Sequence, residues 1–197
     1  MELKNLIEVH LDLPRLSQVL DELGPPGRLW SVNQWTRGNL AVLWEAAKGF
    51  RALTLDDFVP TSVGPLVPVV HDGKNSLPLF AHFRKQFCKP NDESRKELFG
   101  YNLQSTSVFT GPGYYVARPS ANEGEVDFDY TKGPTEKPEG WPPVVPSTAR
   151  LGRFVYGGAI DVVRGISSHV SIGRVRKNGH DEDVWFVLVR EDPEPSS

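Results

Sequence analysis

The stretch "HVSIGRVRKNGHDEDVWFVLVRED", residues 169–192, reads as two β-strands joined by a turn. Its second half contains "DVWFVLVRE", which is apolar on both faces, as is typical of a strand that is central in a sheet or covered on both sides. Asn178-Gly179 is a strong signal for a hairpin turn, although the acidic run 181–183 loosens it. This stretch therefore predicts an antiparallel strand pair within a largely buried sheet.

Further strand patterns lie upstream of this hairpin. From residue 99, "FGYNLQSTSVF" alternates Phe99, Tyr101 and Leu103 with small or polar residues, as in a strand with one solvated face. The segment "EVDFDYT", residues 125–131, alternates acidic and apolar residues in the same way. The apolar run "PLVPVV", residues 65–70, contains two prolines, which confine it to a sheet edge or a strand start.

The first 60 residues predict helices. "LPRLSQVLDEL" and "NLAVLWEAAKGF" both place apolar residues at helical spacing. Gly24 followed by Pro25 ends the first helix, and Gly49 is a suitable C-cap for the second. Another helix is expected near residues 76–88, where apolar side chains recur at helical spacing up to Phe87. With that helix in place, "HDGKN", residues 71–75, reads as the turn from a strand into it.

The expected fold class is α+β, with N-terminal helices packed on a curved antiparallel sheet or a small β-barrel. Residues 1–60 would form a mostly helical layer, and residues 65–192 mainly antiparallel β-structure with one helix near 76–88. Closing the sheet would bury the many aromatic residues and remove exposed strand edges. Because 197 residues suit one core better than two, we expect a single domain spanning 1–197.

Composition narrows the functional classes. A formal net charge of -3 argues against general nucleic-acid binding, which depends on neutralising phosphates. No run approaches the roughly 20 apolar residues of a membrane span, and "MELKNLIEVHLDLPRL" lacks the apolar core of a signal peptide. The single cysteine, Cys88, allows neither an internal disulfide nor a cysteine-based zinc site. We therefore expect a cytoplasmic protein that does not bind membranes.

No established catalytic motif occurs in the chain. There is no P-loop, dinucleotide fingerprint, Gly-x-Ser-x-Gly or His-Glu-x-x-His, and we expect neither a metal site nor a cofactor. His71 and His169 each adjoin an apolar strand, from which a ring could point into a cavity. Asp161 lies among apolar residues that would draw its carboxylate toward the core. These three residues are the candidate general bases, and an ordinary structural role is the alternative for each.

The candidate ligand-binding residues combine aromatic and polar side chains. Tyr114 and Tyr115 must face opposite sides of a strand, so one phenol can face an interior pocket. Arg164 is either drawn toward the core or forms an i,i+3 surface ion pair with Asp161 on a short helix. The full set of ligand-binding candidates is Lys74, Asn75, Tyr101, Tyr114, Tyr115, Tyr156 and Arg164.

The segments "FVYGGAIDVVRGISSHVSIGRV" and "VWFVLVRED" resemble part of a calycin-like family, in which a Gly-x-Trp-x-Gly domain precedes a second domain of unknown function. In that second domain a strand ending in a tyrosine leads to an Ile-Asp segment, an arginine and a closing strand pair. The resemblance covers roughly the last quarter of the chain, and the Gly-x-Trp-x-Gly signature itself is absent. It implies a barrel suited to a small apolar ligand, with Tyr156, Asp161 and Arg164 as matched positions.

The sequence is compatible with three functions. The first is binding of a small, partly apolar or aromatic molecule in an aromatic-lined pocket. The second is a metal-independent enzyme of the isomerase, cyclase or hydrolase type, in which a histidine or aspartate of that pocket acts as a general base. The third is a structural or protein-interaction module that uses the proline-rich loop at 132–147 as its surface. Homodimerisation is left open.

Overall fold

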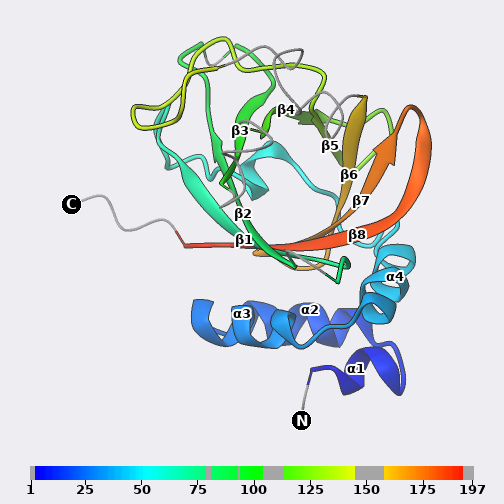
Figure 1. The fold of residues 1–197 in the computed structure, drawn as a ribbon. Coiled ribbons are helices and arrows are strands. Elements are labelled where there is room, and N and C mark those ends of the chain that lie inside the picture. The colour runs from blue at the N-terminus through cyan, green and yellow to red at the C-terminus, as the bar shows by residue number, and fades with distance from the viewer. Residues whose placement is uncertain (1–2, 79–80, 93, 104–112, 145–157, 193–197) are drawn as a thin grey trace.

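The computed structural model describes residues 3–78, 81–92, 94–103, 113–144 and 158–192 (Figure 1). Helices occupy the N-terminal part of the chain, as the sequence predicts. They are α1 (Asn5–Glu8), α2 (Leu13–Glu22), α3 (Pro25–Asn33), α4 (Arg37–Ala46) and the 3-10 helix η1 (Leu55–Asp57). No helix in the described part of the chain combines the length and apolarity that a membrane crossing requires.

The rest of the described chain forms a closed antiparallel β-barrel in which each strand pairs with the next and β8 pairs with β1. The strands are β1 (Val69–Asn75), β2 (His82–Cys88), β3 (Leu98–Leu103), β4 (Gly113–Pro119), β5 (Val126–Asp129), β6 (Ala159–Gly165), β7 (Val170–Lys177) and β8 (His180–Arg190). The sequence analysis left a curved sheet and a small β-barrel as alternatives, and the structure shows the barrel. Among the described residues, more lie in strands than in helices, so the helical part is smaller than the class α+β suggests.

The helix expected near residues 76–88 is wrong, because residues 82–88 form strand β2. Phe83 and Phe87 are four residues apart, a spacing that places two side chains on one face of a helix and also on one face of a strand. Pairing with β1 and β3 on both sides satisfies the backbone of this segment as a strand. The "HDGKN" segment is accordingly the body of β1 and not a turn.

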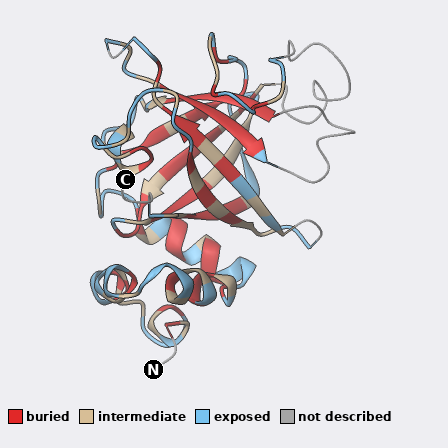
Figure 2. Cartoon of the chain, turned by 90° about the vertical axis from the view of Figure 1, so that its left-hand side faces the viewer, coloured by how far each residue is buried: buried red, intermediate tan, exposed pale blue. Residues whose placement is uncertain are grey.

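The N-terminal helices cover the outer face of β7 and β8 (Figures 1 and 2). Leu16 and Leu43 from these helices are fully buried in one apolar cluster with Val187 of β8. Leu188, the next residue along β8, faces the barrel interior and is equally buried. The part of β8 from Trp185 to Val189 is therefore covered on both sides, as its continuous apolar sequence predicts.

One end of the barrel is closed by the segment around η1, and we call it the η1 end. Phe58 follows η1, and its ring centroid lies 5.1 Å from that of Phe87 on β2 and 5.3 Å from that of Phe128 on β5. Val59 is fully buried in the same interior cluster. At the opposite end, here called the far end, strands β1, β3, β5 and β7 finish and strands β2, β4, β6 and β8 begin.

Candidate functional site

Four polar side chains meet inside the barrel, nearer the far end than the η1 end: Lys85 of β2, Asn102 of β3, Tyr130 just after β5, and Asp161 of β6. The Lys85 ammonium Nζ donates to Asn102 Oδ1 at 2.9 Å and to Asp161 Oδ2 at 3.3 Å, and it also contacts the Tyr130 hydroxyl. That hydroxyl donates to Asp161 Oδ2 at 3.0 Å and accepts from Asn102 Nδ2 at 3.2 Å. We call these four residues the interior polar cluster.

Aromatic rings surround the ammonium group of this cluster. Lys85 Nζ lies 4.7 Å from the ring centroid of Tyr115 and 5.0 Å from that of Tyr130. A cation within about 6 Å of a ring face is attracted by the ring quadrupole, more strongly when water is excluded. Among the described residues, the rings whose centroids lie within 5.6 Å of Nζ are those of Phe83, Tyr115, Phe128, Tyr130 and Phe186.

Glycines on neighbouring strands give three of these rings a place against the barrel wall. Tyr115 pairs directly with Gly100, and a Cβ atom added to Gly100 would lie 1.9 Å from Tyr115 Cε2. Phe186 has the same relation to Gly173, with a closest distance of 2.1 Å. The third pair is Phe83 and Gly73. Because the rings lie against the wall, the space between them is left to the Lys85 side chain.

Burial shifts both charged members of the cluster toward their neutral forms. Desolvation lowers the pKa of Lys85, and the nearby Asp161 carboxylate only partly offsets it. Desolvation likewise raises the pKa of Asp161, against the attraction of Lys85 and the hydrogen bond from Tyr130. A buried ion pair often contributes no more stability than apolar residues of the same volume. The cluster is therefore poorly explained by stability alone.

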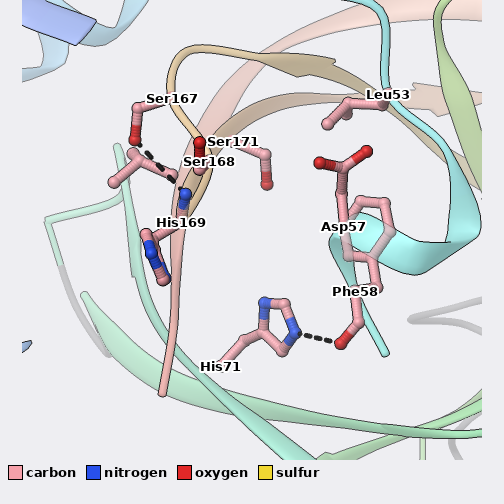
Figure 3. A pocket seen from close by; sticks show the side chains of 9 residues that line it. Leu53, Asp57, Phe58, His71, Ser167, Ser168, His169 and Ser171 are labelled. Atoms are coloured by element: carbon pink, nitrogen blue, oxygen red, sulfur yellow. Dashed lines mark hydrogen bonds between the residues drawn. The ribbon is translucent and has the colours of Figure 1, made fainter. Parts of the chain in front are cut away.

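The two candidate histidines lie on a small cavity at the η1 end, with a volume of about 10 Å³ (Figure 3). This is close to the space that one water molecule needs. His71 Nε2 donates to the Phe58 carbonyl oxygen at 3.0 Å, so the other ring nitrogen, which faces the cavity, is a hydrogen-bond acceptor. His169 lies across the cavity, with its Nδ1 3.0 Å from Asp192 Oδ1. The structure thus places these two histidines on the same cavity, whereas Asp161, the third candidate base, belongs to the interior polar cluster.

His71 makes the stability of the fold depend on pH. Burial lowers its pKa from 6.5 to about 3, so the ring is neutral in the folded protein, whereas the unfolded chain takes up a proton below pH 6.5. The contribution of the neutral His71 ring to the free energy of unfolding is fully present above pH 6.5 and is lost as the pH falls toward 3. Between pH 7.5 and pH 5 we expect His71 to account for a loss of about 2 kcal/mol in the free energy of unfolding.

Urea unfolding at a series of pH values measures this loss. His71→Leu is the matched control, because it removes the titrating ring and leaves the other histidines in place. The pH dependence between 7.5 and 5 should be weaker in the variant than in the wild-type protein by that amount. Equal pH dependence in the two proteins would contradict a neutral, buried His71.

Two of the ligand-binding candidates lie on the outer face of the barrel, under the helices. Lys74 Nζ donates to the carbonyl oxygens of Asn33, at the end of α3, and Trp35. Arg164 Nε donates to the Glu125 carboxylate at 2.6 Å, and its guanidinium lies 3.7 Å from the ring centroid of Trp44. Both side chains join the helical layer to the barrel. Arg164 lies on a strand, so the short helix considered for residues 161 and 164 is wrong.

Tyr101 and Tyr114 also face outward, where Trp141 covers them. Tyr114 donates to the Pro142 carbonyl oxygen, and burial raises its pKa to about 12. Tyr115, the other residue of the Tyr114-Tyr115 pair, is inside the barrel, so the two phenols do face opposite sides of β4. Asn75 lies at the far end of β1, where its side-chain oxygen accepts from Leu77 N. Tyr156 falls outside the described residues.

The cluster thus contains three residues that the sequence analysis did not select, namely Lys85, Asn102 and Tyr130. One signal for Lys85 is present in "HFRKQFC", where Phe83, Lys85 and Phe87 alternate as residues on one face of a strand do. In the part of the chain that the structure describes, no group of three His, Cys, Asp or Glu side chains is placed to hold a metal ion. In comparisons with known proteins, the sequence matches no family model and shows no significant similarity to a curated protein.

Proposed function

We propose that this protein binds a small, partly apolar molecule inside its barrel. The aromatic rings would contact the apolar part of the ligand, and the interior polar cluster would orient its polar part. The observation that carries this proposal is the convergence of four hydrogen-bonded polar side chains, from four parts of the barrel wall, on one aromatic-lined interior. Ligand sites in proteins commonly combine apolar walls with a few converging polar groups.

Two further features support this use of the interior. Phe58 and Val59 fill the η1 end, whereas Asn102, Tyr130 and Asp161 of the cluster come from the parts of β3, β5 and β6 that are nearest the far end. The centre of the described interior is occupied by Lys85, whose four-carbon stem is flexible. A ligand would take the space between the rings as this stem swings aside. The calycin-like resemblance of the last quarter of the chain points to the same use and is part of the proposal.

Native mass spectrometry of the gently purified protein, compared with a denatured sample, tests the proposal. We expect a bound mass that is released on denaturation. Lys85→Met should lower the affinity for that molecule at least tenfold, because the substitution keeps the volume and removes the polar contact. Lys48→Met, at an exposed position beyond the end of α4, is the matched control and should bind normally. An apo mass, with no thermal shift across a metabolite panel, would contradict the proposal.

The opposite pKa shifts of Lys85 and Asp161 favour general acid–base catalysis as a second candidate function. A carboxyl group that holds its proton and an amine that has lost one would form an acid and a base beside the bound molecule. The ligand found by mass spectrometry decides between the two functions. Its conversion by the wild-type protein, and not by Asp161→Asn, would identify an enzyme, whereas unchanged ligand would identify a carrier.

A further inference from the structure

We propose that Lys85 binds its ligand covalently and reversibly, as an imine formed with an aldehyde or ketone. This inference rests on the proposed function, because it assigns a chemical class to the molecule in the barrel. The Lys85 Nζ is the one primary amine in the interior polar cluster, and the lysine side chain is 3% exposed. It contacts two groups that can exchange protons with it, the Asp161 carboxyl group and the Tyr130 hydroxyl.

The charge balance of the cluster favours a neutral ligand group. Lys85 and Asp161 form one cation and one anion, or two neutral groups after proton transfer, so the cluster carries no net charge in either case. A ligand carboxylate would bring a second anion beside Asp161, and a ligand ammonium would bring a second cation beside Lys85. Uncompensated charge beside buried groups such as these is costly. A carbonyl group is neutral and accepts hydrogen bonds from Nζ and from the Tyr130 hydroxyl.

The surroundings also favour the reactive form of the amine. Only the unprotonated amine attacks a carbonyl carbon, and burial lowers the pKa of Lys85. Asp161 Oδ2 lies 3.3 Å from Nζ and 3.0 Å from the Tyr130 hydroxyl oxygen, so one carboxyl oxygen serves both groups. Asp161 can thus receive a proton from the amine and return it to the substrate oxygen, with Tyr130 as the second donor.

The reaction is balanced without any further reagent. The nitrogen lone pair of Lys85 forms a bond to the carbonyl carbon while the C=O π pair moves to oxygen, which takes up a proton and gives a carbinolamine. The C–O bond then breaks, the nitrogen forms a double bond to carbon, and the oxygen leaves as water with the two protons that the amine has lost. Hydrolysis reverses the sequence and releases the carbonyl compound and the free amine.

Reductive trapping tests this inference. The wild-type protein is incubated with trans-cinnamaldehyde and cyanoborohydride, which converts an imine into a stable secondary amine, and the modified lysines are mapped by peptide mass spectrometry. Cinnamyl alcohol, which has the same skeleton without the carbonyl group, is tested separately for non-covalent binding. We expect one adduct per chain, on Lys85, with at least tenfold more modification there than on the exposed Lys48. Lys85→Met should lose this adduct and retain slow modification elsewhere.

The two probes separate the failure of this inference from failure of the proposed function. If cinnamyl alcohol binds inside the barrel and cyanoborohydride traps adducts only on exposed lysines, the imine is wrong and the proposed function stands. If neither probe binds and Lys85 stays unmodified, the result counts against both. Because the mapping is made on the wild-type chain, its outcome does not depend on whether the Lys85→Met variant folds.

Discussion

Asp161→Asn is expected to lower the free energy of unfolding by about 3–5 kcal/mol at pH 7. The substitution keeps the size of the side chain and its acceptor for the Tyr130 hydroxyl, but it removes the negative charge next to Lys85. Lys85 must then either keep a buried charge without a counter-ion or give up its proton, and both lower the stability of the folded state. Urea unfolding followed by tryptophan fluorescence measures the loss.

Two controls separate the lost charge from other effects. In Lys85→Met/Asp161→Asn both charges are absent, and we expect its stability to return to within about 1–2 kcal/mol of the wild-type protein. The deficit of Asp161→Asn alone should shrink between pH 7 and pH 9. In this variant the pKa of Lys85 is lower in the folded protein than in the unfolded chain, because the amine is buried. Unfolding therefore takes up a proton, and the free energy of unfolding rises with pH. Additive losses in the double variant would mean that the two groups do not interact.

Gly100→Ala is expected to lower the free energy of unfolding by about 2–3 kcal/mol, a large effect for one added methyl group. The new Cβ would stand 1.9 Å from Tyr115 Cε2, so the ring must leave its place against the wall. The space beside it is filled by Lys85 Nζ, 4.7 Å from the ring centroid, and by Phe128. The ring can move only by displacing these neighbours. Chemical denaturation measures the loss.

Gly64→Ala is the matched control, because no heavy atom lies within 4 Å of its added Cβ and its φ is not in the left-handed region. Its effect should stay within about 0.5 kcal/mol. Shortening the ring-bearing partner tests the mechanism: in Gly100→Ala/Tyr115→Leu the cost of the alanine should largely disappear, so the combined loss is smaller than the sum of the two single losses. Strict additivity would contradict a clash between these residues.

The sequence predicted most of the strands but not the closure of the barrel, because alternating residues report directly on strands and not on their pairing. "EVDFDYT" faces Val126, Phe128 and Tyr130 inward, and the hairpin at 169–192 forms β7 and β8 as expected. The error at residues 82–88 has a physical origin, since apolar residues four positions apart fit the periodicity of a helix and also that of a strand. Only the long-range pairing of this segment with β1 and β3 decides between them, and no local pattern reports that pairing.

The candidate site was predicted in part. Asp161 was found because its neighbours are apolar, and Tyr115 because adjacent residues of a strand face opposite sides. Lys85 was missed because a charged residue between Arg84 and Gln86 normally faces solvent, and because the segment was expected to be a helix. Asn102 was assigned to a solvated face, but both faces of β3 are covered in the structure. Its neighbour Tyr101 lies under Trp141 on the outer side.

The order of the strands also bears on how the chain folds. Seven of the eight strand pairings join neighbours in sequence, and such local contacts form quickly. The eighth joins His71 to Arg190 and its neighbours, across most of the chain, so its formation carries the largest loop-closure entropy. Strand β8 also forms the surface on which the N-terminal helices pack. Barrel closure and helix docking thus depend on the same late-synthesised strand, and a nascent chain on the ribosome completes neither until β8 has emerged.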